Sequence, residues 1–136
     1  MCVSLLNIDG IPGGMMASQP RRPSASEELS PHYAALTNDV VFGDIWERDG
    51  LSKRDRSLIT VAALTALYRT NQLRAHIGLA LRNGVTRDEI VEVIEHMAIY
   101  SGFPNAGNGF EVAREVFDRV DARAKAKGTS QKGVGS

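Results

Sequence analysis

The sequence predicts an all-α fold, a single-domain bundle of about five to six helices. Apolar residues recur at helical spacing through the middle of the chain, and capping residues, glycines and prolines mark the helix ends. No alternating pattern of useful length predicts a strand. The length of 136 residues is that of one domain, which can bury roughly two thirds of its unfolded surface.

The two ends of the chain have the composition of flexible tails. Residues 1–28 are rich in glycine, proline and serine, and residues 122–136 are rich in lysine, glycine and serine. The C-terminal segment offers little to bury. The sequence therefore predicts an N-terminal tail over residues 1–28, a helical domain over residues 29–121 and a C-terminal tail over residues 122–136.

The first helices of the domain are marked by their N-terminal residues and their apolar content. Ser30 and Pro31 can serve as the N-cap and first residue of a helix that runs to about Glu47. A second helix is predicted over about residues 53–69, and its apolar residues cover nearly the whole circumference. Such a helix is either central in the fold or buried in part against another subunit.

Three further helices follow in the second half of the domain. The third begins at Thr70 or the residue after it, and Gly84 ends it. Thr86 and Glu89, three residues apart, form a capping box that opens the fourth. The last helix is predicted over about residues 105–120.

The composition argues against several classes of function. Sixteen basic residues balance sixteen acidic ones, so nucleic acid or an anionic membrane surface is not expected as the main partner. Cys2 is the only cysteine, which excludes an intramolecular disulfide, a cysteine-based zinc site and a Cys-x-x-Cys redox pair. The three histidines lack metal-ligand spacing, so no metal is expected. Without a secretory signal or an apolar run of membrane-spanning length, we expect the cytoplasm.

His76 is the first candidate for chemistry. On a helical wheel it falls between Leu79 and Ala80, inside the apolar arc of its helix. A titratable group in a dry pocket suits proton transfer, because its proton affinity depends on the polar neighbour that reaches it. A hydrogen-bonded core histidine has the same pattern, so the helix alone leaves both interpretations open.

Three more residues are candidates for binding a ligand. His96 and Tyr100, four residues apart, lie on one flank of the apolar face of their helix, where the edge of a pocket is expected. They could equally be boundary residues of the core. Arg56, near the start of the all-apolar helix, could hold a substrate carboxylate, or it could be a surface arginine paired with Asp55 or Asp88.

Four segments, taken in order, resemble the carboxymuconolactone decarboxylase family: residues 42–46, residues 56–64, His76 followed by residues 84–90, and residues 96–106. Each motif is soft by itself, but their order and spacing together are specific. The resemblance covers about residues 36–120, which is most of the predicted domain.

The thiol-peroxidase branch of that superfamily carries a Cys-x-x-Cys-x-x-x-His motif, with a glycine eight residues after the histidine. His76 and Gly84 keep this spacing, but Arg69 and Gln72 stand at the two cysteine positions, and Ser57 stands where that branch tends to have glutamate. Because the dithiol is missing, thiol-peroxidase activity is excluded. The chain resembles the decarboxylase branch.

The resemblance implies decarboxylation of 4-carboxymuconolactone to the 4-oxoadipate enol-lactone and CO2, a reaction of aromatic catabolism. No cofactor is expected, since the lactone carbonyl of the substrate accepts the electrons left by CO2. We expect His76 to donate the proton, Arg56 to anchor a substrate carboxylate, and His96 and Tyr100 to donate hydrogen bonds to the lactone oxygen or the second carboxylate. The resemblance to this family also implies an obligate oligomer, either a homotrimer or a homohexamer.

Two alternatives remain open at the level of sequence. One is an enzyme of the same fold that acts on a different small acid or lactone, since fold does not fix function. The other is a protein without catalytic activity that binds a small acid or assembles with another protein.

Overall fold

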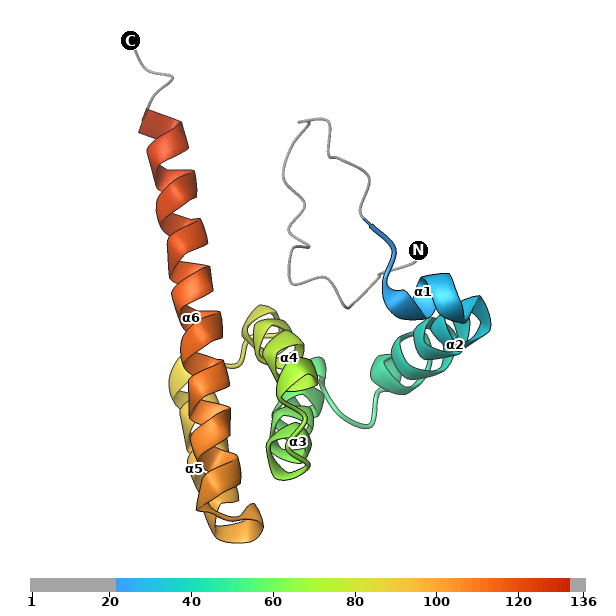
Figure 1. Cartoon of the computed structure of the whole chain (residues 1–136), viewed down its shortest axis with the longest axis horizontal. Helices are drawn as coiled ribbons and strands as arrows, with labels where there is room; N and C mark the ends of the chain where they lie inside the picture. The colour runs from blue at the N-terminus through green and yellow to red at the C-terminus, as the bar shows by residue number, and fades with distance from the viewer. Residues whose placement is uncertain (1–21, 133–136) are drawn as a thin grey trace. The chain divides into compact units, whose positions relative to one another are not determined.

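The computed structural model describes residues 22–132, with side chains as far as Gly128 (Figure 1). Every regular element in this range is helical, which confirms the predicted all-α class. The chain forms two compact units that divide after Lys53. Cys2 and the predicted N-terminal tail up to residue 21 lie outside the described residues, as do the last residues of the predicted C-terminal tail.

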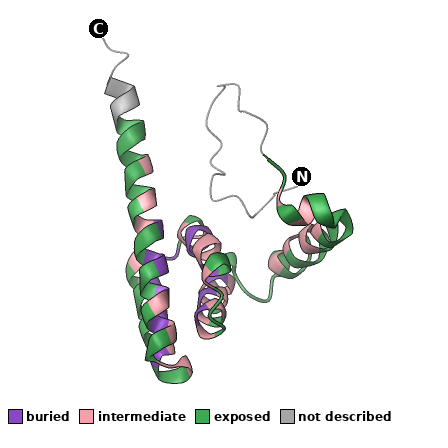
Figure 2. Ribbon diagram, viewed as in Figure 1, coloured by how far each residue is buried: buried purple, intermediate pink, exposed green. Residues whose placement is uncertain are grey.

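The first unit is built from short helical segments. They are α1 (Ala25–Leu29), α2 (Pro31–Leu36), the π-helix η1 (Thr37–Phe42) and the 3₁₀-helix η2 (Ile45–Glu47). Ser24 and Glu27 form a capping box for α1, so regular structure begins inside the segment predicted as a tail. None of the four segments contains a buried residue (Figure 2).

The prediction of one continuous helix from Pro31 to about Glu47 was wrong. The N-cap was predicted correctly, because the Ser30 hydroxyl accepts a hydrogen bond from the Tyr33 amide. After α2, however, the backbone widens into the π-helix η1, which ends at Phe42 and is followed by Gly43. A Cβ atom at Gly43 would lie 2.7 Å from the carbonyl oxygen of Asp39, so this close approach of the backbone requires glycine.

The second unit contains α3 (Lys53–Ala66), α4 (Thr70–Arg82), α5 (Arg87–Ser101) and α6 (Phe103–Lys132) (Figure 1). Asn83, at the end of α4, donates a hydrogen bond of 2.9 Å to Ser57 in the first turns of α3. Arg54 forms an ion pair with Glu89 in the first turn of α5. The start of α3 therefore lies beside the end of α4 and the start of α5, so α3 runs antiparallel to α4 and parallel to α5.

At the opposite end of this unit, Asn105 connects α6 to the ends of α3 and α5 by hydrogen bonds. Its side-chain amide donates hydrogen bonds of 3.0 Å to the carbonyl oxygens of Ala66 and Ser101. These bonds satisfy orphan acceptors at the ends of α3 and α5, where the helical hydrogen-bond pattern stops. The first turn of α6 is thereby joined to two other helices.

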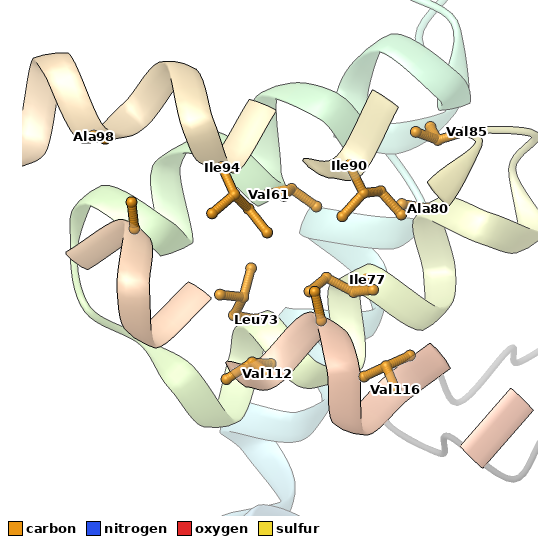
Figure 3. Close-up of a cluster of buried hydrophobic side chains, with 12 residues drawn as sticks. Val61, Leu73, Ile77, Ala80, Val85, Ile90, Ile94, Ala98, Val112 and Val116 are labelled. Carbon is orange, nitrogen blue, oxygen red and sulfur yellow. The ribbon is translucent and has the colours of Figure 1, made fainter. Parts of the chain in front are cut away.

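The core lies among the four helices of the second unit (Figure 3). Gly109 lets α6 pack closely, because a Cβ atom there would lie 3.0 Å from Cγ2 of Ile94 and 3.3 Å from Cγ2 of Thr65. The apolar helix α3 is not enclosed within one chain, since Ile59 is 55% exposed. The buried apolar residues of the core are Val61, Leu73, Ile77, Ala80, Val85, Ile90, Ile94, Ala98, Ala106, Val112, Ala113 and Val116.

The ends of these helices follow the sequence signals closely. The capping box at the start of α5 is confirmed, with Thr86 Oγ1 accepting from the Glu89 amide at 3.2 Å and the Glu89 carboxylate accepting from the Thr86 amide at 2.8 Å. Gly84 and Gly102 have positive φ angles of 88° and 95°. Tyr68, after the end of α3, also has a positive φ of 54°, which is uncommon for a bulky residue.

The last helix extends beyond its predicted limits. α6 runs from Phe103 to Lys132, whereas the sequence predicted a helix over about residues 105–120. Residues 121–127 contain alanine, arginine and lysine, which have high intrinsic helix propensity. This polar segment therefore continues the helix although it has little to bury. No described helix is both long enough and apolar enough to cross a membrane.

Candidate active site

His76 lies on the flank of α4 that carries Asn83 and is turned toward α3. Asn83 follows it by seven residues, or about two helical turns, and shares this flank. The Asn83 side chain bonds to Ser57 at 2.9 Å, which shows that the flank is turned toward α3. His76 therefore stands in the α3–α4 hairpin, at the border of the core.

The environment of His76 is partly apolar. Its side chain is half-buried and its Nδ1 atom is buried. This burial lowers the pKa of the His76 imidazole below its ordinary value of 6.5, because desolvation disfavours the charged form. A pKa lowered by burial is found in structural histidines of a core as well as in catalytic ones, so the shift is compatible with both interpretations of His76.

Arg56 precedes Ser57 in α3 and is half-buried, with its Nε atom buried. Its neighbour Arg54 contacts Asp55 at 3.6 Å and also pairs with Glu89. Arg56 brings a second cation to the hairpin, next to the residue that contacts Asn83.

Arg56 and His76 lie at different levels along the α3–α4 hairpin. Because Asn83 contacts Ser57, the Arg56 backbone lies near the level of Asn83 along the hairpin. Seven residues of helix separate that level from His76, which corresponds to about 10 Å.

His96 and Tyr100 contact each other on α5. Their ring centroids are 4.7 Å apart and their planes are tilted by 37°. His96 also lines an open groove between α3 and α5 with a volume of about 430 Å³. The other lining residues are Leu58, Ile59, Ala62, Glu92, Val93 and Met97.

The structure thus groups the predicted site residues into two clusters. Arg56 and His76 belong to the α3–α4 hairpin, whereas His96 lines the α3–α5 groove and Tyr100, which is 73% exposed, contacts His96 outside the groove lining. On a helical wheel the groove residue Ile59 lies about 60° from Arg56, three residues earlier in α3, so the two clusters use neighbouring flanks of this helix.

The sequence of this region matches a known protein family. A model of the carboxymuconolactone decarboxylase family matches residues 31–115, which include both clusters. The chain belongs to the carboxymuconolactone decarboxylase family.

Two relatives in this family have names that describe a reaction. The chain is 43% identical to a 4-carboxymuconolactone decarboxylase of Acinetobacter baylyi over 90 residues, which cover 66% of this chain and 67% of that protein. It is 33% identical to a nitrosuccinic acid decarboxylase of Metarhizium robertsii over 87 residues, which cover 63% of this chain and 61% of that protein.

Two residues that the structure joins beside Arg56 carried weaker sequence signals. Ser57 was noted only for the glutamate that another branch has at its position, and Asn83 was not singled out. Asn83 could have been found from its place seven residues after His76, on the same flank of the helix. No cluster of three or more histidine, cysteine, aspartate or glutamate residues within residues 22–132 could hold a metal ion.

Proposed function

We propose that this chain is a carboxy-lyase that converts 4-carboxymuconolactone into the 4-oxoadipate enol-lactone and CO2. The observation that carries the proposal is the half-buried His76, in the same hairpin as Arg56 and about 10 Å from its level along the helix. The family and the identity to the Acinetobacter baylyi decarboxylase support the choice of substrate. The cytoplasm, as the compartment of this reaction, is part of the proposal.

The chemistry follows from the structure of the substrate. The departing carboxylate is attached to the ring carbon next to the ring oxygen, and a ring double bond conjugates that carbon to the lactone carbonyl. When the bond to CO2 breaks, its electron pair moves through the double bond into the carbonyl and gives a furan-like enolate. One proton added to carbon then forms the enol-lactone, so the reaction consumes one proton and releases one CO2.

Each proposed residue has one task in this sequence. The planar guanidinium of Arg56 binds the carboxylate that stays on the substrate, since its fork matches two carboxylate oxygens. His76 delivers the proton to carbon as a general acid. The apolar surroundings of His76 keep water away from the departing carboxylate, which favours its loss. The roles of His96 and Tyr100 as hydrogen-bond donors to the lactone oxygen or the second carboxylate stay predictions. A substrate that contacts His96 must reach the α3–α5 groove.

The protonation of His76 predicts the pH dependence. Burial lowers the pKa of His76 in the unliganded enzyme, so its acid form is populated below the ordinary value of 6.5. We expect kcat/KM to fall as pH rises, with a midpoint below 6.5. The substrate carboxylates favour the imidazolium, so the midpoint for kcat should lie at higher pH. Steady-state rates from pH 5 to 8 measure both midpoints. A kcat/KM that is independent of pH in this range contradicts the role of His76.

A homo-oligomer, either a trimer or a hexamer, is also part of the proposal. Several large apolar side chains stay exposed in the second unit, among them Ile99 and Phe103 at 74% each. Exposed apolar surface of this kind is typical of surfaces that pack against another protein. The apolar helix α3, with Ile59 exposed, supports the same interpretation.

The direct test measures CO2 release and loss of ultraviolet absorbance when purified protein is mixed with 4-carboxymuconolactone, without added metal or cofactor. Light scattering on the same sample gives the particle mass, to be compared with 14.7 kDa for one chain. We expect saturable turnover by a particle of three or six chains. A folded protein without turnover would reject the substrate, and a particle of one chain would reject the oligomer.

One alternative substrate class deserves the same assay. The Metarhizium robertsii relative is named for nitrosuccinic acid, so decarboxylation within this family is not tied to one acid. Turnover of another small acid, in the absence of turnover of the lactone, would keep the carboxy-lyase proposal and change its substrate. Ligand binding without turnover of any acid would support a binding protein instead.

A further inference from the structure

Two buried polar side chains in α3 differ in the way their hydroxyl groups are bonded. Ser57 and Thr65 are each 1% exposed. The Thr65 hydroxyl donates to the carbonyl oxygen of Val61 at 2.8 Å, so it is satisfied inside its own helix. The Ser57 hydroxyl accepts a hydrogen bond of 2.9 Å from Asn83, which belongs to the end of α4. Only the bond at Ser57 joins two helices.

The location of this bond connects it to the candidate active site. Ser57 directly follows Arg56, and Asn83 lies about two turns after His76 on the same flank of α4. The bond therefore fixes the turn that carries one functional side chain relative to the helix that carries the other. A slip of α3 along α4 would break it, and the same slip would change the distance between Arg56 and His76.

Packing alone does not account for a serine at this position. Alanine has a higher helix propensity than serine and would place no polar atom in the core. A buried hydroxyl must keep its partner, since an unsatisfied polar group in the interior is unfavourable. The Ser57–Asn83 hydrogen bond therefore fixes the position of α3 along α4. Such a position matters for catalysis, because a displacement of about 1 Å at a reacting centre can reduce a rate roughly 100-fold.

We propose that Ser57 and Asn83 are positioning residues, which hold Arg56 and His76 at the separation that the reaction needs. This inference rests on the proposed function of Arg56 and His76. Neither Ser57 nor Asn83 needs to touch the substrate. Their effect is exerted through the register of the α3–α4 hairpin.

The test compares Ser57→Ala, Asn83→Ala and the double variant with Thr65→Val, a matched control that removes a buried hydroxyl bonded within its own helix. We expect each single variant to lower kcat by roughly 10- to 100-fold, because the reacting groups lose their alignment. The double variant should lose no more than either single one, since both remove the same bond. Thr65→Val should stay within about twofold of the wild type. Full activity in Ser57→Ala would overturn the proposal.

A second measurement separates this inference from the identity of the substrate. Proton NMR titration of the His76 imidazole reports its environment whether or not the lactone is turned over, and the spectrum of His76→Gln assigns the signal. We expect Ser57→Ala and Asn83→Ala to move the midpoint of this titration and Thr65→Val to leave it in place. If the wild type does not turn over the lactone, the proposed substrate fails and the titration still decides on positioning. An unchanged midpoint in both variants would overturn it.

Discussion

Replacement of His76 by glutamine is expected to lower kcat for 4-carboxymuconolactone by roughly 100- to 10,000-fold, the range that a positioned general acid contributes. Glutamine is polar and of similar length, but it has no proton that it can give to carbon. KM should change much less, because the proposed anchor Arg56 is unaffected. Steady-state kinetics of CO2 release measure both constants.

The matched control is His32→Gln, which changes an exposed histidine of α2 that has no role in the proposed site. It should leave kcat unchanged. Circular dichroism and light scattering show whether His76→Gln keeps its fold and particle mass. A folded His76→Gln variant with wild-type kcat would exclude His76 as the proton donor, and attention would pass to His96.

Replacement of Ile94 by alanine is expected to lower the free energy of unfolding by about 2–5 kcal/mol. Ile94 is fully buried between α3, α5 and α6, where its Cγ2 atom fills the space left by Gly109. Truncation removes apolar contacts and leaves a cavity, which close packing at Gly109 cannot readily fill. Urea unfolding followed by circular dichroism gives the change.

Ile99→Ala on the same helix is the control for this prediction. Ile99 is 74% exposed, so its loss should change the free energy of unfolding by less than about 0.5 kcal/mol in a sample dilute enough to contain single chains. If the protein assembles through this surface, the control becomes sensitive to concentration, whereas Ile94→Ala does not. Equal losses for both variants at low concentration would contradict the described core.

The sequence was sufficient for elements whose signals are local. The Thr86–Glu89 capping box and the stop at Gly84 depend on residues within one turn, and both are found in the structure. The break after α2 was missed because a π-turn has no distinct hydrophobic period. Gly43 was visible as a glycine between aromatic residues, but the close approach to Asp39 that requires it is a backbone contact.

The candidate site was predictable one helix at a time. The helical wheel placed His76 inside the apolar arc of its helix, whereas the structure leaves its side chain half-buried at the border of the core. His96 and Tyr100 lie together on one flank of α5, but Tyr100 is 73% exposed. Contacts between helices depend on how α3 packs against its neighbours, and the hydrophobic periodicity within one helix does not contain this information. The hydrogen bond from Asn83 to Ser57 is a contact between two helices, so the sequence did not predict it.

Tyr68 has a consequence for attempts to make the protein more heat-resistant. A left-handed backbone costs a residue with a side chain about 1–2 kcal/mol, a cost that glycine avoids and asparagine tolerates better. Replacing Tyr68 in the turn between α3 and α4 by glycine or asparagine should therefore raise the free energy of unfolding. An engineer would begin at this turn and leave the core unchanged, and would learn from the activity of each variant whether the aromatic ring is needed.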